Sequence, residues 1–162
     1  MSKAFTRESD DEQETPLPVR APLPPGIKNY ITPAGAQRLR DELASLLSAH
    51  AVEVRAGQAD VRTSRKLARI RQLQEIVGSL VIAEHPAEKE VVRFGATVSV
   101  QRQNARETYR LVGVDEGDLD RNEISWLSPL AKVLLGKRAG DRVPLGSPAG
   151  SEELTIVSVS YQ

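Results

Sequence analysis

The 162-residue sequence contains no cysteine and only two histidines. The absence of cysteine excludes disulfides, thiol catalysis and cysteine-ligated zinc. His50 and His85 stand far apart, and no H-x-x-H or H-E-x-x-H spacing occurs. The sequence therefore predicts no metal site built on cysteine or histidine.

Long hydrophobic runs are also missing, since no apolar stretch approaches the roughly 20 residues that a membrane span needs. The opening stretch MSKAFTRESDDEQETPLP is polar and acidic and lacks the apolar core of a signal peptide. These features are typical of a soluble protein of the cytoplasm. With 22 basic and 22 acidic residues, the chain has no overall field for coating nucleic acid, so charge effects must come from local patches.

Motifs for nucleotide binding and for nucleophilic catalysis are absent as well. No G-x-x-x-x-G-K-[ST] occurs, no G-x-G-x-x-G follows a predicted strand, and no serine stands in a G-x-S-x-G setting. Aromatic residues make up only 4% of the chain. The sequence therefore predicts a protein that is not an enzyme and that uses no cofactor.

The N-terminal segment, residues 1–29, holds five of the ten prolines and a run of acids. It has few apolar side chains to bury, and its prolines interrupt both helices and strands. We expect residues 1–29 to form a disordered tail, which either is passive or binds a partner. Its acidic residues are Glu8, Asp10, Asp11, Glu12 and Glu14.

Residues 30–84 carry the pattern of two helices. Thr32 suits an N-cap, and Pro33 suits the first helical position, where its missing N–H has no intrahelical partner to lose. Two apolar stripes follow at helical spacings, with a turn at residues 57–60 between them. We expect an antiparallel coiled-coil hairpin, weakened near its base by Gly78. The stripes are Ala36, Leu39, Leu43, Leu46, Leu47 and Val54, then Leu67, Ile70, Leu73, Val77 and Leu80.

From residue 85 to residue 162 the apolar period changes to two, which predicts strands at 97–100, 108–112, 123–127 and 154–159. Between them, Ser128, Pro129 and Gly136 are the start and stop signals of a short helix. The expected fold class is α+β, with the helical hairpin followed by a small antiparallel sheet and one helix.

The stretch QADVRTSRKLARIR, residues 58–71, sets five bases against the single acid Asp60. Arg62, Arg65, Lys66 and Arg69 recur at spacings of three and four, so they share one helical face. No acid nearby in the sequence compensates their repulsion. This face is either a solvated outer surface or a surface for a polyanionic partner.

A second charged group, acidic this time, stands between two predicted strands. It matches the D-x-D-x-D-G order of a calcium-binding loop only loosely. We interpret it as a solvated hairpin loop, with an acidic contact surface for a basic partner as the alternative. Its members are Asp115, Glu116, Asp118, Asp120 and Glu123.

The C-terminal half resembles a known family. The runs VVRFGATVSV (91–100) and TYRLVGVDEGDLDRNEISWLSPLAKVLLGKRAGD (108–141) resemble the C-terminal domain of the GreA/GreB bacterial transcription elongation factors. The shared pieces are F-G-A-T-V, Y-R-[IL]-V-G-x-D-E, I-S-x-x-S-P-[IL]-A and L-[LI]-G-K, in the same order and spacing. The run ITPAGAQRLRDELASL, from residue 31, resembles the start of the family's coiled coil.

The resemblance implies a two-part molecule. A domain of FKBP-like fold docks on bacterial RNA polymerase at the rim of the secondary channel, and the coiled coil enters the channel. Association with DNA and RNA is then indirect, and the factor acts as a monomer. The implied docking surface lies at the strand-to-helix turn, with two acids that add charge complementarity. These residues are Ile124, Ser125, Ser128, Pro129 and Leu130, with Asp115 and Glu116.

The tip of the coiled coil departs from the family pattern. Cleavage factors of the family carry G-D-x-x-E-N-A-E-Y, whose two acids help to hold a catalytic Mg²⁺. Here the stretch is A-D-V-R-T-S-R-K-L, so Asp60 matches the first acid and Thr63 replaces the second. The hairpin is also shorter than in GreA or GreB. Both departures favour a noncleaving, Rnk-like or Gre-like regulator.

Two alternatives remain open from the sequence. One is an active cleavage factor whose acids are Asp60 and Glu53. The other is a peptidyl-prolyl isomerase, which the FKBP-like fold suggests, although fold alone does not carry function. Isomerase pockets of that fold are lined with aromatic side chains, and this chain has few.

Overall fold

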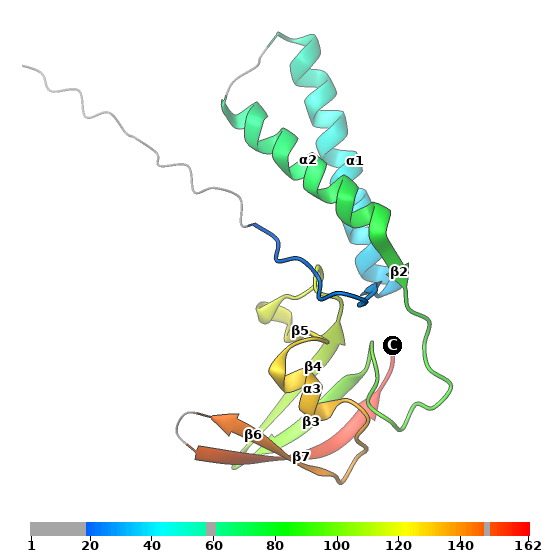
Figure 1. The fold of residues 1–162 in the computed structure, drawn as a ribbon, viewed down its shortest axis with the longest axis vertical. Coiled ribbons are helices and arrows are strands. Elements are labelled where there is room, and N and C mark those ends of the chain that lie inside the picture. The colour runs from blue at the N-terminus through cyan, green and yellow to red at the C-terminus, as the bar shows by residue number, and fades with distance from the viewer. Residues whose placement is uncertain (1–18, 58–60, 148–149) are drawn as a thin grey trace, which may run out of the picture.

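The computed structural model describes residues 19–57, 61–147 and 150–162. A helical arm projects from a mixed domain that contains the main sheet (Figure 1). In chain order the elements are β1 (Asn29–Ile31), α1 (Pro33–Arg55), α2 (Val61–Ser79), β2 (Leu80–Ile82), β3 (Thr97–Arg102), β4 (Ala105–Val112), the 3-10 helix η1 (Leu119–Arg121), β5 (Glu123–Ser125), α3 (Pro129–Leu134), β6 (Arg142–Ser147) and β7 (Gly150–Ser160). The α+β class predicted from the sequence is confirmed.

The arm is the predicted antiparallel hairpin of α1 and α2. Thr32 is its N-cap, with extended backbone angles and a side chain that accepts a hydrogen bond from the Gly35 amide. Pro33 occupies the first helical turn, as predicted. The second helix continues through Gly78 and ends at Ser79.

The distal half of the arm differs from the predicted apolar stripe. Leu47 is 42% exposed and Val54 is 63% exposed, so neither packs in the interface between the helices. Half-buried His50 and Glu53 stand there instead, because they continue the three-and-four spacing that runs through Leu46. The seam between the helices is therefore apolar near the base of the arm and polar toward its tip.

A two-stranded parallel sheet closes the base of the arm, and the sequence did not predict it. Asn29 to Ile31 of β1 pair in register with Leu80 to Ile82 of β2. Ile31 is fully buried there, in one cluster with Ala36, Leu39, Leu73 and Ile76. The chain entering α1 and the chain leaving α2 are thus fixed to each other.

The main sheet has the strand order β5-β4-β3-β7-β6. Its β3–β4, β3–β7 and β6–β7 pairs are antiparallel, as predicted, but β5 pairs with β4 in parallel. The fully antiparallel sheet was therefore a wrong prediction in this one pairing. Strand β6 was missed, because Pro144 and Gly146 interrupt any strand pattern in its sequence. The short helix α3 begins as predicted, with Ser128 as N-cap and Pro129 in its first turn.

Two predictions concern the ends of these elements. The tail was predicted to be disordered over residues 1–29, but residues 19–29 are part of the described structure, and Arg20 and Asn29 bond to Asp115. Residues 1–18 lie outside the described residues, as does Asp60 at the predicted turn. No helix in the described part of the chain is long and apolar enough to cross a membrane.

The position of the seam can be tested by truncating one leucine inside it and one outside it. Leu73 is fully buried, so Leu73→Ala should lower the free energy of unfolding by about 2–5 kcal/mol. Leu47→Ala removes a side chain that is 42% exposed and should cost clearly less. Urea denaturation followed by circular dichroism measures both, and equal losses would contradict the assignment.

Candidate functional site

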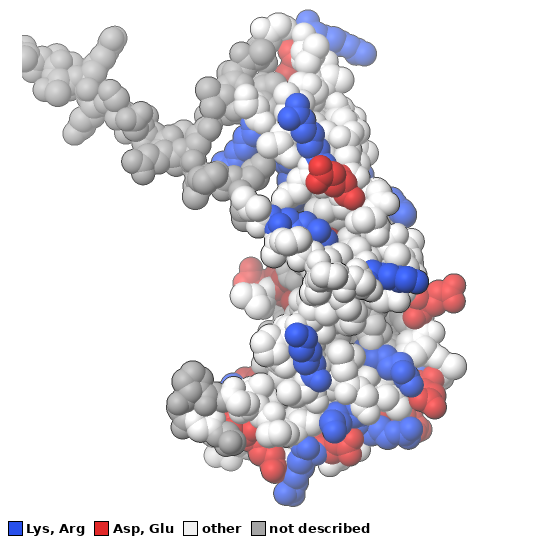
Figure 2. All heavy atoms as spheres, viewed as in Figure 1, with Lys and Arg blue, Asp and Glu red and all other residues white. Residues whose placement is uncertain are grey.

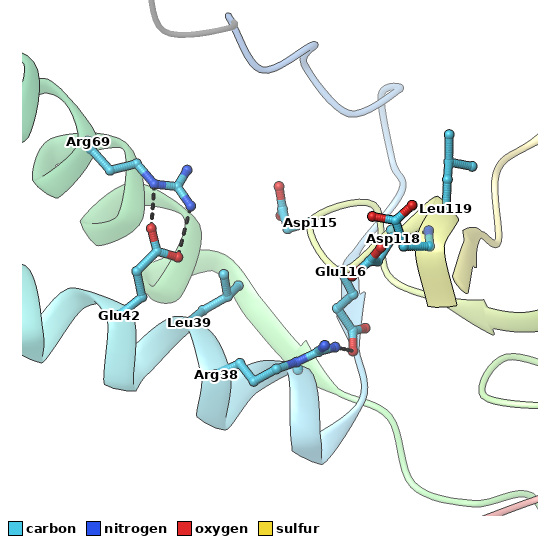
Figure 3. A pocket seen from close by; sticks show the side chains of 11 residues that line it. Arg38, Leu39, Glu42, Arg69, Asp115, Glu116, Asp118 and Leu119 are labelled. Atoms are coloured by element: carbon cyan, nitrogen blue, oxygen red, sulfur yellow. Dashed lines mark hydrogen bonds and ion pairs between the residues drawn. The ribbon is translucent and has the colours of Figure 1, made fainter. Parts of the chain in front are cut away.

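The junction between the arm and the mixed domain is built around one buried carboxylate. Glu116, in the loop after β4, accepts hydrogen bonds from the amides of Thr32 at 2.9 Å and Gly113 at 2.7 Å. The Thr32 hydroxyl donates a further hydrogen bond to it. The Arg38 guanidinium lies 3.9 Å from the carboxylate (Figure 3). These donors compensate the burial of the charge, since an ionised carboxylate without partners is very costly in the interior.

Thr32 both caps α1 and contacts the mixed domain. Its hydroxyl oxygen accepts from the Gly35 amide at 3.0 Å, which caps α1, and its proton points to Glu116. The residue that starts the arm is therefore also the residue that fastens the arm to the mixed domain.

Two glycines allow the backbones to approach this closely. A Cβ added at Gly35 would lie 1.9 Å from the Oε1 atom of Glu116. One added at Gly113 would lie 2.3 Å from the backbone oxygen of Tyr30. A side chain at either position is incompatible with the observed junction, and at Gly113 the obstacle is backbone, which cannot rotate away.

Asp115, the neighbour of Glu116, binds the N-terminal segment. Its carboxylate receives two hydrogen bonds from the Arg20 guanidinium, at 2.6 and 2.8 Å, and one from the Asn29 amide at 3.2 Å. The hydrogen bond to Asp115 raises the pKa of Arg20, against the lowering effect of burial. Asp115 and Glu116 were predicted to contact a partner, but both carboxylates are committed to this chain, and Glu116 is out of reach of any partner in this arrangement.

The rest of the acidic group is not a uniformly solvated loop, which corrects the sequence interpretation. Glu123 is buried and faces Arg38 at 3.5 Å and Arg110 at 3.8 Å. Asp118 caps η1, while Leu119 beside it is 85% exposed. An open cleft of about 560 Å³ separates this loop from the arm (Figure 3). It is lined by Gly35, Arg38, Leu39, Glu42, Arg69 and residues 115–120.

The predicted docking residues of the strand-to-helix turn form one continuous surface segment. Ile124 and Leu130 are half-buried and pack against the core of the sheet. The Ser125 hydroxyl accepts from the Leu127 amide, and the Ser128 hydroxyl accepts from the Ala131 amide, both at 3.2 Å. Pro129 alone among the five is exposed. Ser128 thus caps α3 and Ser125 stabilises the turn before it, and whether this surface docks a partner stays a prediction.

The basic face of the arm is partly neutralised from the other helix, contrary to the expectation that nothing compensates it. Lys66 forms an ion pair with Glu53. Arg69 binds Glu42 through two hydrogen bonds of 2.7 and 2.9 Å (Figure 3). Arg65 is exposed and has no ion pair among the described residues. The side chain of Arg62 and all of Asp60 lie outside what the structure describes.

Figure 2 shows the resulting surface, with basic side chains spread along the visible face of the arm and isolated acidic side chains among them. The sequence reasoning found the bases but missed Arg20, Gly35 and Gly113, which build the junction. Arg20 bonds to Asp115, 95 positions away, Gly35 meets Glu116 and Gly113 meets the backbone of Tyr30, so no local spacing could have revealed them.

Comparison with known proteins gives a consistent picture. A family model described as "Transcription elongation factor, GreA/GreB, C-term" matches residues 87–161. Transcription elongation factor GreB of Neisseria meningitidis serogroup B is 41% identical over 155 aligned positions, which cover 83% of this chain and 94% of that protein. GreA of Verminephrobacter eiseniae is 34% identical over 153 positions, covering 82% of this chain and 97% of its own length.

Among solved structures, Thermus aquaticus Gfh1 is 26% identical and covers 82% of this chain and 98% of its own, with a TM-score of 0.42. A structural likeness of that size does not bear on function. The sequence identities to the two elongation factors are the informative part of the comparison.

The double role of Thr32 can be tested with two substitutions of similar size. Thr32→Val removes both the cap and the hydroxyl that faces Glu116, and it should lower the free energy of unfolding by about 2 kcal/mol or more. Thr32→Ser keeps the hydroxyl and should retain most of the stability. Thermal unfolding would separate the two, and a valine variant as stable as the serine variant would disprove the role of the hydroxyl.

Alanine substitutions at two glycines, one inside the junction and one in helix α2, give a second test of the close approach at the junction. Gly113→Ala should destabilise the protein by about 1–3 kcal/mol, because the new methyl group meets the Tyr30 carbonyl. Gly78→Ala places a methyl group in open space within α2 and should stabilise it by up to about 1 kcal/mol. Chemical denaturation measures both signs, and a neutral Gly113→Ala would show that the junction can relax.

Proposed function

This chain belongs to the GreA/GreB family of transcription elongation factors, and on that basis we propose that it binds bacterial RNA polymerase at the rim of the secondary channel and regulates elongation without stimulating transcript cleavage. The charge arrangement on the arm is the observation that supports regulation without transcript cleavage. Two of its acids, Glu42 and Glu53, are bound to Arg69 and Lys66.

The mixed domain supplies the docking surface in this proposal. The surface consists of the turn from β5 to α3, with Ile124, Ser125, Ser128, Pro129 and Leu130. Ile124 and Leu130 are anchored in the core, and the two serines hold the turn in shape by capping it. Exposed Pro129 then supplies the most accessible part of the proposed contact. Asp115 and Glu116 leave the proposed contact set and act instead by holding the arm.

The arm enters the channel in this proposal, with its junction as a fixed base. Helix α1 has 23 residues, which corresponds to a length of about 35 Å. The alignment with the Neisseria GreB spans 155 positions but covers only 83% of this 162-residue chain, so part of the relative has no counterpart here. A shorter arm accounts for such a difference, and it reaches less deeply.

The described residues of the arm do not fit a magnesium site. Glu53 is the acid that an active cleavage factor would pair with Asp60, but its carboxylate is bound by the Lys66 ammonium, which competes directly with a cation. In the part of the chain that the structure describes, no group of three or more His, Asp or Glu residues could hold a metal ion. Hard divalent cations need several oxygen ligands, and the sequence of residues 58–71 supplies a single acid, Asp60, among five bases.

The remaining features of the proposal rest on the membership of the GreA/GreB family. The factor has no catalytic activity of its own, acts as a monomer in the cytoplasm, and meets DNA and RNA only through the polymerase. The isomerase alternative loses support, because Tyr30, Phe94 and Trp126 pack against one another with ring centroids 5.7 to 6.1 Å apart. Those aromatic rings serve the junction of β1 with the mixed domain.

The docking surface is tested by Pro129→Asp. Aspartate suits the first turn of a helix, so the variant should fold normally while it places a charge on the proposed contact. Retention of RNA polymerase on the immobilised variant should fall at least tenfold, which corresponds to about 1.4 kcal/mol. Gln103→Asp is the matched control, because Gln103 is exposed in the β3–β4 turn at φ 50°, which aspartate tolerates. Unchanged retention of Pro129→Asp would refute this surface.

The absence of cleavage is tested on stalled, backtracked transcription complexes, with polymerase binding confirmed in the same samples. We expect the transcript to keep its length with this protein and to shorten with a GreB cleavage factor. Rapid shortening that disappears in Asp60→Ala would instead establish the alternative, an active cleavage factor.

A further inference from the structure

Residues 19–28 form a strap that lies between the arm and the mixed domain. On one side it contributes Val19, Arg20 and Pro22 to an open groove of about 500 Å³ against α2. On the other side Arg20 holds Asp115 of the loop after β4. The strap leads into β1, whose Asn29 side chain donates a hydrogen bond to the Ser79 hydroxyl at the base of α2. It therefore runs in the same direction as α2, from the middle of the helix to its base (Figure 1).

The first residue of the strap, Val19, is the point at which residues 1–18 are attached to the described structure. Val19 is 95% exposed and lines the groove together with Ala68 and Gln72 of α2. Arg65 precedes Ala68 by three positions and Gln72 by seven, so it lies on the same side of α2, one turn nearer the tip. Arg65 is exposed, and it has no ion pair among the described residues. An unpaired base thus stands close to the point where residues 1–18 join the structure.

The sequence that joins there is strongly acidic. Residues 8–14, ESDDEQE, contain five acids and no base, and only residues 15–18 separate them from the strap. An extended chain covers about 3.3–3.6 Å per residue, so this spacer reaches well beyond one helical turn of about 5.4 Å. A tether this short gives an effective concentration in the millimolar range, which makes a weak charge contact significant.

We propose that the acidic segment 8–14 of this chain binds the basic face of α2 at Arg65, with the strap as its tether. The contact is intramolecular and electrostatic. It extends toward the tip of the arm, because Glu75 lines the groove on the side nearer the base and repels acids there. The segment then covers the part of the basic face that α1 leaves uncompensated.

Three other bases of α2 are weaker candidates for this contact. Lys66 and Arg69 already have carboxylate partners on α1. Arg71 is exposed, but six residues from Arg65 correspond to a rotation of about 240° around the helix, which places it on a different face. Arg71 therefore provides a matched control for Arg65.

The inference concerns the free protein and does not depend on polymerase binding. Its consequence is competition, since any polyanion that approaches this face of the arm must first displace the acidic segment. Such a contact weakens steeply with salt, because the Debye length falls from about 10 Å at 0.1 M to about 3 Å at 1 M.

The absence of cysteine makes a direct test simple. Ser9→Cys introduces a single thiol into the acidic segment of the full chain, and a nitroxide attached there broadens the NMR signals of nearby amides. We expect strong broadening at Arg65 and Ala68 at low salt and none at Arg106, which lies in the main sheet. The broadening should disappear in Arg65→Glu and at about 0.5 M salt, and it should persist in Arg71→Glu.

Three outcomes would overturn the proposal. The first is no broadening of α2 in the parent chain, and the second is broadening that survives Arg65→Glu. The third is broadening that occurs only when spin-labelled chains are mixed with separate isotope-labelled chains, since the contact would then be between molecules. The failure of the polymerase pull-down would leave all of these outcomes unaffected, so the two proposals are tested separately.

Discussion

The structure depends on the burial of the Glu116 carboxylate at the N-terminus of α1. Its position at the start of a helix is favourable for a negative charge, and it receives two backbone amides and one hydroxyl as donors. This contact fixes the base of the arm to the mixed domain. The glycines at positions 35 and 113 exist to permit the approach, so the runs ITPAG and VGVDE form the two halves of one contact. Their joint presence in the sequence therefore has a physical reason.

Much of the fold could be predicted because its signals are local. The caps at Thr32 and Ser128 were predicted from the residue and its immediate neighbours, and both are confirmed. The hairpin and four of the strands, β3, β4, β5 and β7, follow from apolar periodicity. The three-residue strands β1 and β2 were beyond reach, because a strand that short shows no period and forms only when its partner is brought alongside. The parallel pairing of β5 likewise depends on a path through η1 that no residue pattern specifies.

The candidate site was predicted less well, and for a related reason. Charges were read along the chain, where the bases of residues 62–71 have no acidic neighbours. In the folded arm their neighbours belong to α1, so Glu42 and Glu53 compensate two of them. The acidic group of residues 115–123 was predicted to be more solvent-exposed than it is. Its members looked like a solvated loop, but four of them are bound to bases or to backbone donors. Only a knowledge of non-local packing distinguishes a structural carboxylate from one that is free for a partner.

The change from an apolar to a polar seam gives the arm a gradient of rigidity. Near the base, Leu73 and Ile31 are fully buried and the strand pair β1–β2 ties the helices together. Toward the tip, the Nδ1 atom of His50 and the Oε2 atom of Glu53 are buried without a hydrogen-bond partner among the described residues, and each such atom costs stability. Local opening therefore requires least free energy at the distal end. The contact between the two helices is therefore strongest next to the mixed domain and weakens with distance from it, so the mixed domain and the base of the arm set the course of both helices.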